Sequence, residues 1–102
     1  MSDRRAYTRL EMHAGVFIIR GETAFLTEVS NVSAGGVSVV RPENWQEDPD
    51  GIYHLYFVLD PDRILCLKGS VVHESVDHLG FTFAKGYAIQ SEQLLAESRT
   101  WL

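Results

Sequence analysis

Hydrophobic and polar residues alternate in short runs from residue 14 to residue 84. In the clearest run, residues 52–59, every second side chain is large and apolar, as expected for a strand with one buried face. Short clusters of Gly, Asp, Asn and Pro, which favour turns, stand between several of the runs. The pattern predicts six strands, at residues 14–20, 23–30, 37–40, 52–59, 64–74 and 79–84.

The two ends of the chain differ from this pattern. Residues 1–12 are polar and irregular, and we expect them to form a flexible arm. Residues 91–102 contain many helix formers, and Ser91 is placed to cap the start of a helix. The apolar residues of this helix form one stripe that can pack against the strands: Leu94, Leu95, Trp101 and Leu102. A helix that binds a partner is the alternative interpretation.

Six short strands joined by short turns indicate an antiparallel β-barrel, because closure of the sheet removes its exposed edges. We therefore predict an all-β fold with a C-terminal helix. A chain of 102 residues is long enough for one core and too short for two. The expected single domain covers residues 1–102, with the arm at 1–12, the barrel at 14–84 and the helix at 91–102.

Composition and charge narrow the range of functions. Nine basic and fourteen acidic residues give a formal net charge of -5, which is unfavourable for binding nucleic acid or an anionic membrane. The single cysteine, Cys66, excludes an intramolecular disulfide. The chain has neither the apolar stretch of a signal peptide nor an apolar run that could cross a bilayer. We expect a cytoplasmic protein and, without an extra helical segment for association, a monomer.

Three of the nine basic residues lie in the predicted arm: Arg4, Arg5 and Arg9. A guanidinium group is planar and can bind a phosphate, or the O6/N7 edge of guanine, through two parallel hydrogen bonds. Three such groups on a flexible arm can close over one compact anion. Taken alone, N-terminal arginines are more often solvated charges that add solubility.

A polar turn at residues 31–36 separates the second and third predicted strands. The side chains of Asn31 and Ser33 can bond to the backbone or to the polar edge of a ligand. Gly35 and Gly36 permit positive φ and carry no Cβ that would block a planar ring. An ordinary turn is the simpler interpretation when this segment is considered alone.

The arginine arm and the polar turn occur in this order, with a pair of predicted strands between them, and together they resemble the PilZ domain family. The resemblance covers nearly the whole chain and implies a six-stranded barrel with a C-terminal helix. It also implies that matching arginines bind phosphate and guanine, and that the Asn-x-Ser-x-x-Gly turn recognises a guanine edge. Asn31 stands where Asp is commoner in the family, which predicts lower affinity.

His73 ends the fifth predicted strand, on the same face as the core residues. Members of the family often carry an aromatic or basic residue there, which can stack on a base. A rim histidine without ligand contact is an equally good interpretation. A metal site is not expected, because a turn at residues 75–78 would separate the nearby histidines and carboxylates.

The resemblance implies a bacterial receptor for the second messenger cyclic di-GMP, without enzymatic activity or a cofactor. Ligand binding would order the arm and so relay the signal to a downstream protein that is not identified. The predicted ligand-binding residues are Arg4, Arg5, Arg9, Asn31, Ser33, Gly35, Gly36 and His73. The alternatives are a PilZ-like interaction scaffold without nucleotide binding, and a small barrel for single-stranded nucleic acid, which the negative charge disfavours.

Overall fold

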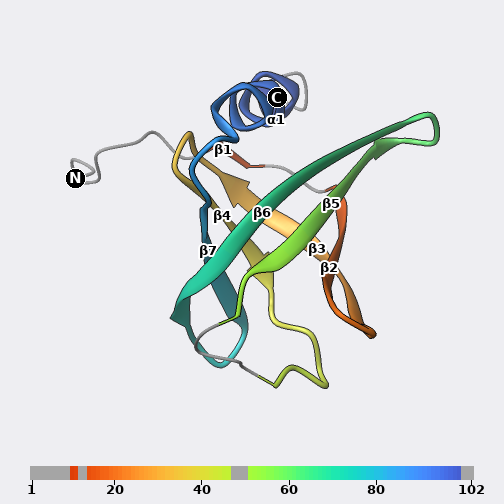
Figure 1. The fold of residues 1–102 in the computed structure, drawn as a ribbon, viewed down its shortest axis with the longest axis vertical. Helices are drawn as coiled ribbons and strands as arrows, with labels where there is room; N and C mark the ends of the chain where they lie inside the picture. The colour runs from red at the N-terminus through yellow and green to blue at the C-terminus, as the bar shows by residue number, and fades with distance from the viewer. Residues whose placement is uncertain (1–9, 12–13, 47–50, 100–102) are drawn as a thin grey trace.

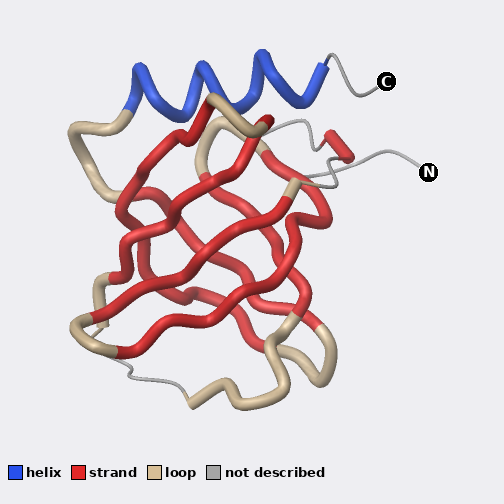
Figure 2. Tube along the Cα trace, turned by 90° about the vertical axis from the view of Figure 1, so that its right-hand side faces the viewer, coloured by secondary structure: helices blue, strands red, loops and turns tan. Residues whose placement is uncertain are grey.

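The alternating runs form a ring of antiparallel strands, shown from two directions in Figures 1 and 2. The computed structural model describes residues 10–11, 14–46 and 51–99. The ring follows the order β3-β2-β5-β6-β7-β4, and β4 pairs with β3 to close it. The predicted six-stranded barrel with a C-terminal helix is thereby confirmed. Its strands are β2 (Gly15–Arg20), β3 (Thr23–Val32), β4 (Gly36–Val40), β5 (Tyr53–Asp60), β6 (Arg63–Glu74) and β7 (His78–Phe83).

A further strand of two residues, β1 (Leu10–Glu11), pairs with the end of β3. Leu10 lies opposite Val32, and Glu11 lies opposite Asn31. Leu10 and Glu11 fall within the predicted flexible arm, but the structure holds them on the barrel. β3 also runs beyond its predicted end at residue 30, because β1 and β4 pair with its last residues on either side. Asn31 therefore lies in a strand and not in a turn.

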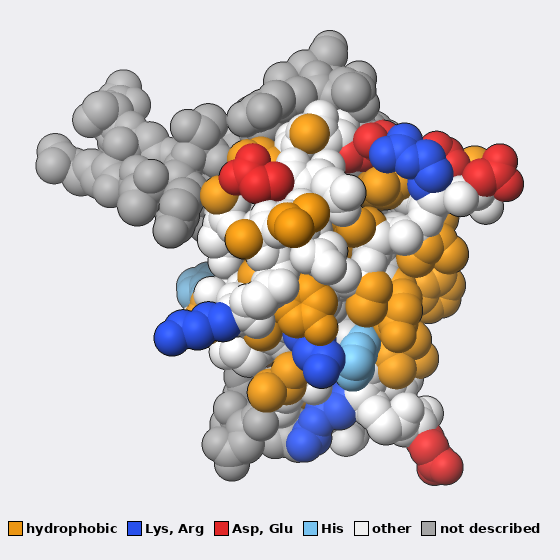
Figure 3. Space-filling view, turned by 45° about the horizontal axis from the view of Figure 1, so that its top comes forward, with side chains coloured by type: hydrophobic (Ala, Val, Ile, Leu, Met, Phe, Trp, Pro, Cys, Tyr) orange, Lys and Arg blue, Asp and Glu red, His pale blue; other side chains and the backbone are white. Residues whose placement is uncertain are grey.

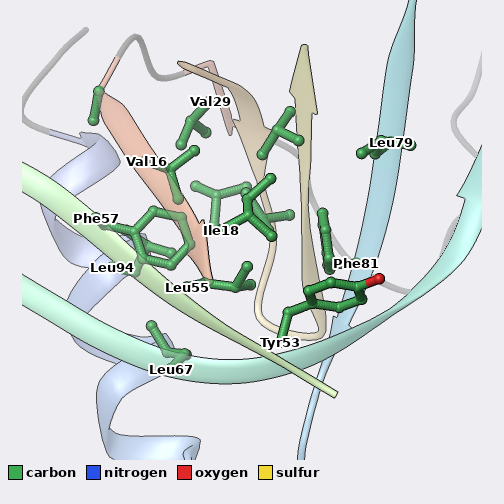
Figure 4. Packing of buried hydrophobic residues seen from close by; sticks show 14 of the residues in the cluster. Val16, Ile18, Val29, Tyr53, Leu55, Phe57, Leu67, Leu79, Phe81 and Leu94 are labelled. Carbon is green, nitrogen blue, oxygen red and sulfur yellow. The ribbon is translucent and has the colours of Figure 1, made fainter. Parts of the chain in front are cut away.

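The core consists of the side chains that alternation directs into the barrel (Figure 4). Along β5, Tyr53, Leu55 and Phe57 are buried, whereas His54 and Tyr56 between them are partly exposed. The largest fully buried side chains come from four strands and the helix: Phe57, Ile18, Leu55, Leu67, Leu79 and Leu94. Burial of apolar surface contributes about 25 cal/mol per Å², so this cluster supplies most of the favourable free energy of folding.

The helix α1 (Ala88–Arg99) covers one end of the barrel (Figure 1). It begins before the predicted start at residue 91, so the prediction that Ser91 caps it is wrong. Ser91 lies inside the first turn, where its hydroxyl donates a hydrogen bond to the carbonyl oxygen of Ala88 at 3.0 Å. Leu94 and Leu95 are buried against the barrel. Trp101 and Leu102, the other members of the predicted stripe, lie outside the described residues.

An ion pair joins the helix to the start of β6. The Arg63 guanidinium donates hydrogen bonds to both carboxylate oxygens of Glu97, at 3.2 and 2.7 Å. These bonds and the charge of Glu97 raise the pKa of Arg63. In the part of the chain that the structure describes, no helix is long and apolar enough to cross a bilayer.

The loop after β4 closes the opposite end of the barrel. Within it, Trp45 is buried, and its ring lies 5.0 Å from Phe25, 5.3 Å from Tyr53 and 6.3 Å from Phe81, measured between centroids. Edge-to-face and tilted aromatic contacts of this kind stabilise a core beyond simple area burial. The loop composition of residues 41–51 gives no sign that its tryptophan belongs to the core.

Candidate functional site

A tight turn joins β3 to β4 at the predicted polar segment. The N–H of Ser33 donates to the carbonyl oxygen of Gly36 at 2.9 Å, and the Ser33 hydroxyl also reaches that oxygen at 3.4 Å. Gly35 and Gly36 do not use positive φ, which among the described residues occurs at Gly21 and Gly86. The freedom in φ that we expected of these two glycines is therefore not used.

Gly36 is required for a different reason. A Cβ at this position would overlap the carbonyl oxygen of Phe81 on the neighbouring strand β7. Gly36 pairs with Thr82 and Val37 with Phe81, so β4 and β7 approach closely at this point. Because Gly36 has no side chain, the backbones of β4 and β7 can approach each other at the edge of the site.

A β-bulge places His73 on the outer surface of the barrel. Val71 pairs with Phe81 and His73 pairs with Gly80, which leaves Val72 as the additional residue in β6. A bulge reverses the inward and outward alternation that follows it. His73 is therefore exposed on the outer face beside Gly80, and the prediction that it faces the core is wrong.

A hollow of about 710 Å³ lies on the outer surface of β4, β7 and the end of β6. Five of the eight predicted site residues line it: Asn31, Ser33, Gly35, Gly36 and His73. The bulge in β6 is what brings His73 to the same side as the polar turn, although the two are far apart in the sequence. The described residues that line the hollow include no Asp or Glu, although the Asp77 carboxylate contacts two of them, Ser75 and His78.

The hollow also has polar lining residues that sequence analysis missed: Ser38, Ser75, His78 and Thr82. In β4, Ser38 lies between the inward residues Val37 and Val39, so alternation alone places it on the outer face. The same reasoning applies to Thr82 in β7, between Phe81 and Phe83. The alternation does not show, however, that β4 and β7 are neighbours in the ring.

His78, the first residue of β7, links the β6–β7 turn to β3 at one end of the hollow. Its Nδ1 lies 3.0 Å from Oδ1 of Asp77, and its Nε2 lies 3.1 Å from Oγ of Ser30. Ser30 is the extra residue of a second bulge, in β3 directly before Asn31. Hydrogen bonds from His78 and from the Ser75 hydroxyl lower the pKa of the Asp77 carboxyl group.

Arg41, just after β4, contacts the turn that carries this network, but its guanidinium is already paired. Its guanidinium lies 2.8 Å from Oε2 of Glu74 and donates a hydrogen bond to the carbonyl oxygen of Ser75 at 3.4 Å. Its backbone N–H donates to the carbonyl oxygen of Asp77 at 2.8 Å. These bonds attach the end of β4 to the β6–β7 turn.

The three predicted arginines, Arg4, Arg5 and Arg9, lie outside the described residues. Arg9 directly precedes Leu10, which pairs with Val32 at the edge of the polar turn. Among the described residues, no three His, Cys, Asp or Glu side chains are placed to hold a metal ion.

The family model described as PilZ domain matches residues 3–98 of the chain. A comparison with curated proteins finds no match. Among solved structures, the chain is similar to the inhibitor of motility MotI/DgrA of Bacillus subtilis, with a TM-score of 0.74, 21% identity and coverage of 97% of this chain. The chain spans about half of that protein, 51% of its length.

Two further similar structures are themselves PilZ domains. The PilZ domain of YcgR from Escherichia coli, solved with cyclic di-GMP, has a TM-score of 0.71 and 14% identity, with coverage of 91% of this chain and 87% of that chain. The PilZ domain of CeSA from a cellulose-synthesizing bacterium has a TM-score of 0.69 and 14% identity, with coverage of 92% and 97%. At these identities the likeness concerns the fold.

Proposed function

The chain belongs to the PilZ domain family, and we propose that it is a non-enzymatic receptor for cyclic di-GMP which binds this ligand in the hollow beside β4 and β7. Cyclic di-GMP has two phosphates, which carry negative charge, and two guanine bases, whose edges donate and accept hydrogen bonds. The hollow presents polar side chains and no carboxylate among its described lining residues. Its volume of about 710 Å³ is within the range of small-molecule sites. In the similar structure of the YcgR PilZ domain, cyclic di-GMP is the ligand.

Asn31 and Ser33 are the proposed contacts to one guanine. The carboxamide oxygen of Asn31 can accept a hydrogen bond from the guanine N–H groups, and the hydroxyl of Ser33 can donate or accept one. Within the described part of the chain, the Asn31 side chain makes no hydrogen bond, so this contact would cost no internal bond. His73, exposed on the opposite wall, offers a ring on which a base can stack.

The observation that carries the proposal is the pairing of β1 with the end of β3. Leu10 is held opposite Val32, next to Ser33, so the chain before Leu10 starts at the rim of the hollow. An extended chain spans at most about 3.6 Å per residue, so Arg5 stays within about 18 Å of Leu10. All three arginines therefore have the reach to close over a ligand in the hollow.

The proposed signal is the ordering of residues 1–9 around the bound ligand. Guanidinium groups on the phosphates would convert this segment into a fixed part of the surface, and order–disorder changes of this kind are a common switching mechanism. A downstream protein that recognises the ordered segment would then distinguish the liganded from the free receptor.

Titration calorimetry with cyclic di-GMP tests this proposal. A charge-assisted hydrogen bond contributes about 1.5–3 kcal/mol, so Arg5→Ala or Arg9→Ala should weaken binding by about tenfold or more. The unfolding temperature without ligand should remain unchanged. Arg20→Ala is the matched control, because Arg20 lies at the β2–β3 turn and does not line the hollow.

Two results would contradict the proposal at different levels. Equal affinity of wild type, Arg5→Ala and Arg9→Ala would reject the arginine contacts but keep the receptor. No binding by the wild-type protein would reject the receptor and favour an interaction scaffold that does not bind nucleotide.

A further inference from the structure

The flank of the barrel formed by β3, β2, β5 and β6 carries a regular grid of outward side chains. Strand pairing arranges them in three rows that run across the four strands. The first row is Glu28, Gly15, Val58 and Ile64, the second is Leu26, Phe17, Tyr56 and Cys66, and the third is Ala24, Ile19, His54 and Lys68. We call these residues the flank grid.

The flank grid is apolar in its middle and exposes large hydrophobic side chains. Leu26 is 65% exposed, Ile64 is 64% exposed and Phe17 is 38% exposed. Figure 3 shows hydrophobic side chains gathered along this flank, at the right of the view. Contiguous exposed apolar surface on a folded domain is typical of an interaction site. The hollow beside β4 and β7 lies elsewhere on the ring, so the flank grid is a separate surface.

The charges of the flank grid lie at opposite corners. Glu28 ends the first row on β3, and Lys68 ends the third row on β6. Neither side chain forms an ion pair with another described residue. Because one acid and one base border the apolar surface at opposite corners, a surface of the same kind can complement it.

We propose that the flank grid binds a second copy of this chain in a symmetric dimer. The grid is nearly square, since three steps between strands and four residues along a strand both span about 14 Å. A two-fold axis along its diagonal therefore places each corner charge opposite the other corner of the second copy. Glu28 of one copy then faces Lys68 of the other, twice. The strands of the two copies cross at about 90°, one of the two common ways in which sheets pack.

The same axis passes through the remaining corners, Ile64 and Ala24. Each of these residues meets its own equivalent in the second copy. A charge introduced at position 64 would therefore be brought against an identical charge, which gives a sharp test of the symmetry.

Sedimentation velocity over a dilution series of the full chain tests the dimer. We expect the wild type to shift from monomer to dimer as concentration rises, and Ile64→Lys to remain monomeric. Ile89→Lys is the matched control, because Ile89 is 74% exposed on α1 and lies outside the flank grid. This variant should dimerise like the wild type.

A charge exchange tests the two ion pairs directly. Glu28→Lys and Lys68→Glu should each weaken the dimer by about tenfold, because each variant places like charges together at both corners. The double variant should restore the wild-type dissociation constant. A wild type that remains monomeric at all concentrations would overturn the proposal and leave the flank grid to a different protein. A dimer that survives Ile64→Lys, or a double variant without restoration, would overturn the proposed geometry.

Discussion

At one end of the hollow, the Asp77 carboxylate accepts hydrogen bonds that stabilise its ionised form. His78 and the Ser75 hydroxyl provide these bonds, at 3.0 and 3.1 Å, and they lower the pKa of Asp77. In the unfolded chain these partners are lost and the carboxyl group keeps its ordinary value of 3.8. The folded state is therefore stabilised as long as Asp77 is ionised in both states, above that value.

As the pH falls below 3.8, the unfolded chain takes up a proton at Asp77 before the folded protein does. The free energy of unfolding should therefore decrease through this range, until the folded carboxyl group is protonated as well. Urea denaturation of wild type and Asp77→Asn between pH 3 and pH 6 measures this effect. The stability of the variant should change less with pH, and parallel curves for the two proteins would contradict the assignment.

The side of the sheet that His73 faces could not be predicted from the sequence. Its parity in the run from residue 64 places it on the core side, and nothing in the sequence marks Val72 as a bulge. The bulge is fixed by pairing with β7, which is a tertiary contact. The presence of His73 in the strand was predictable from the sequence, but the side of the sheet it faces was not.

At the scale of the elements, the close approach of β4 and β7 at Gly36 matters both for the packing of the barrel and for the shape of the hollow. A side chain at Gly36 would overlap the carbonyl oxygen of Phe81, so the two strands would have to separate. We expect Gly36→Ala to reduce the free energy of unfolding by about 1–3 kcal/mol, the usual cost of overpacking. Denaturant unfolding measures this change.

Gly15→Ala provides the control, because a Cβ at Gly15 meets no other atom within 4 Å. Its stability should equal or slightly exceed that of the wild type, since alanine restricts the unfolded chain. Equal stability of Gly36→Ala and Gly15→Ala would show that β4 and β7 can separate without cost.

The elements also differ in how far the sequence predicts them. The strands follow from alternation, and six of them with short turns led correctly to a barrel. The start of α1 did not follow, because Ser91 has the character of a cap but is buried inside the first turn. A serine side chain suits both a cap position and the first turn of a helix, so the sequence does not separate the two. Packing of the helix against the barrel is what places Ser91 in the first turn.

On the scale of the whole molecule, the barrel is closed at its two ends by different means. The helix α1 covers one end, and the loop that holds Trp45 lies at the other, as Figures 1 and 2 show for the two segments. Trp45 contacts Phe25, Tyr53 and Phe81, which belong to three different strands. Its indole N–H has no hydrogen-bond partner among the described residues, so the contacts that the structure describes for this side chain are packing contacts.

Trp45→Ala should lower the free energy of unfolding by about 3–5 kcal/mol, because it opens a large cavity at the end of the core. Trp45→Phe should cost less, since it keeps an aromatic ring and removes the unpaired N–H group. Guanidinium denaturation of both variants gives the two values. Equal losses would indicate that the indole N–H is bonded in solution.

The sequence predicted the closed barrel but not the geometry of the site, and the reason is physical. Barrel closure follows from strand number and turn length, which are local properties. The gathering of Asn31, Ser33 and His73 around one hollow depends on which strands are neighbours in the ring, and the family resemblance supplied this without the geometry. The expected monomer rested on the absence of an extra helix, which does not bear on an exposed sheet face such as the flank grid.

The pairing of β4 with β7 has a consequence for the chain during its synthesis. β4 is complete once the ribosome has added Val40, but its partner β7 follows only with residues His78–Phe83. In a partly folded chain in which β4 has formed and β7 has not yet paired with it, one edge of β4 presents unpaired N–H and C=O groups to any other unfolded polypeptide. Pairing of β7 removes this exposed edge, so the last strand of the barrel also protects the folding chain against aggregation.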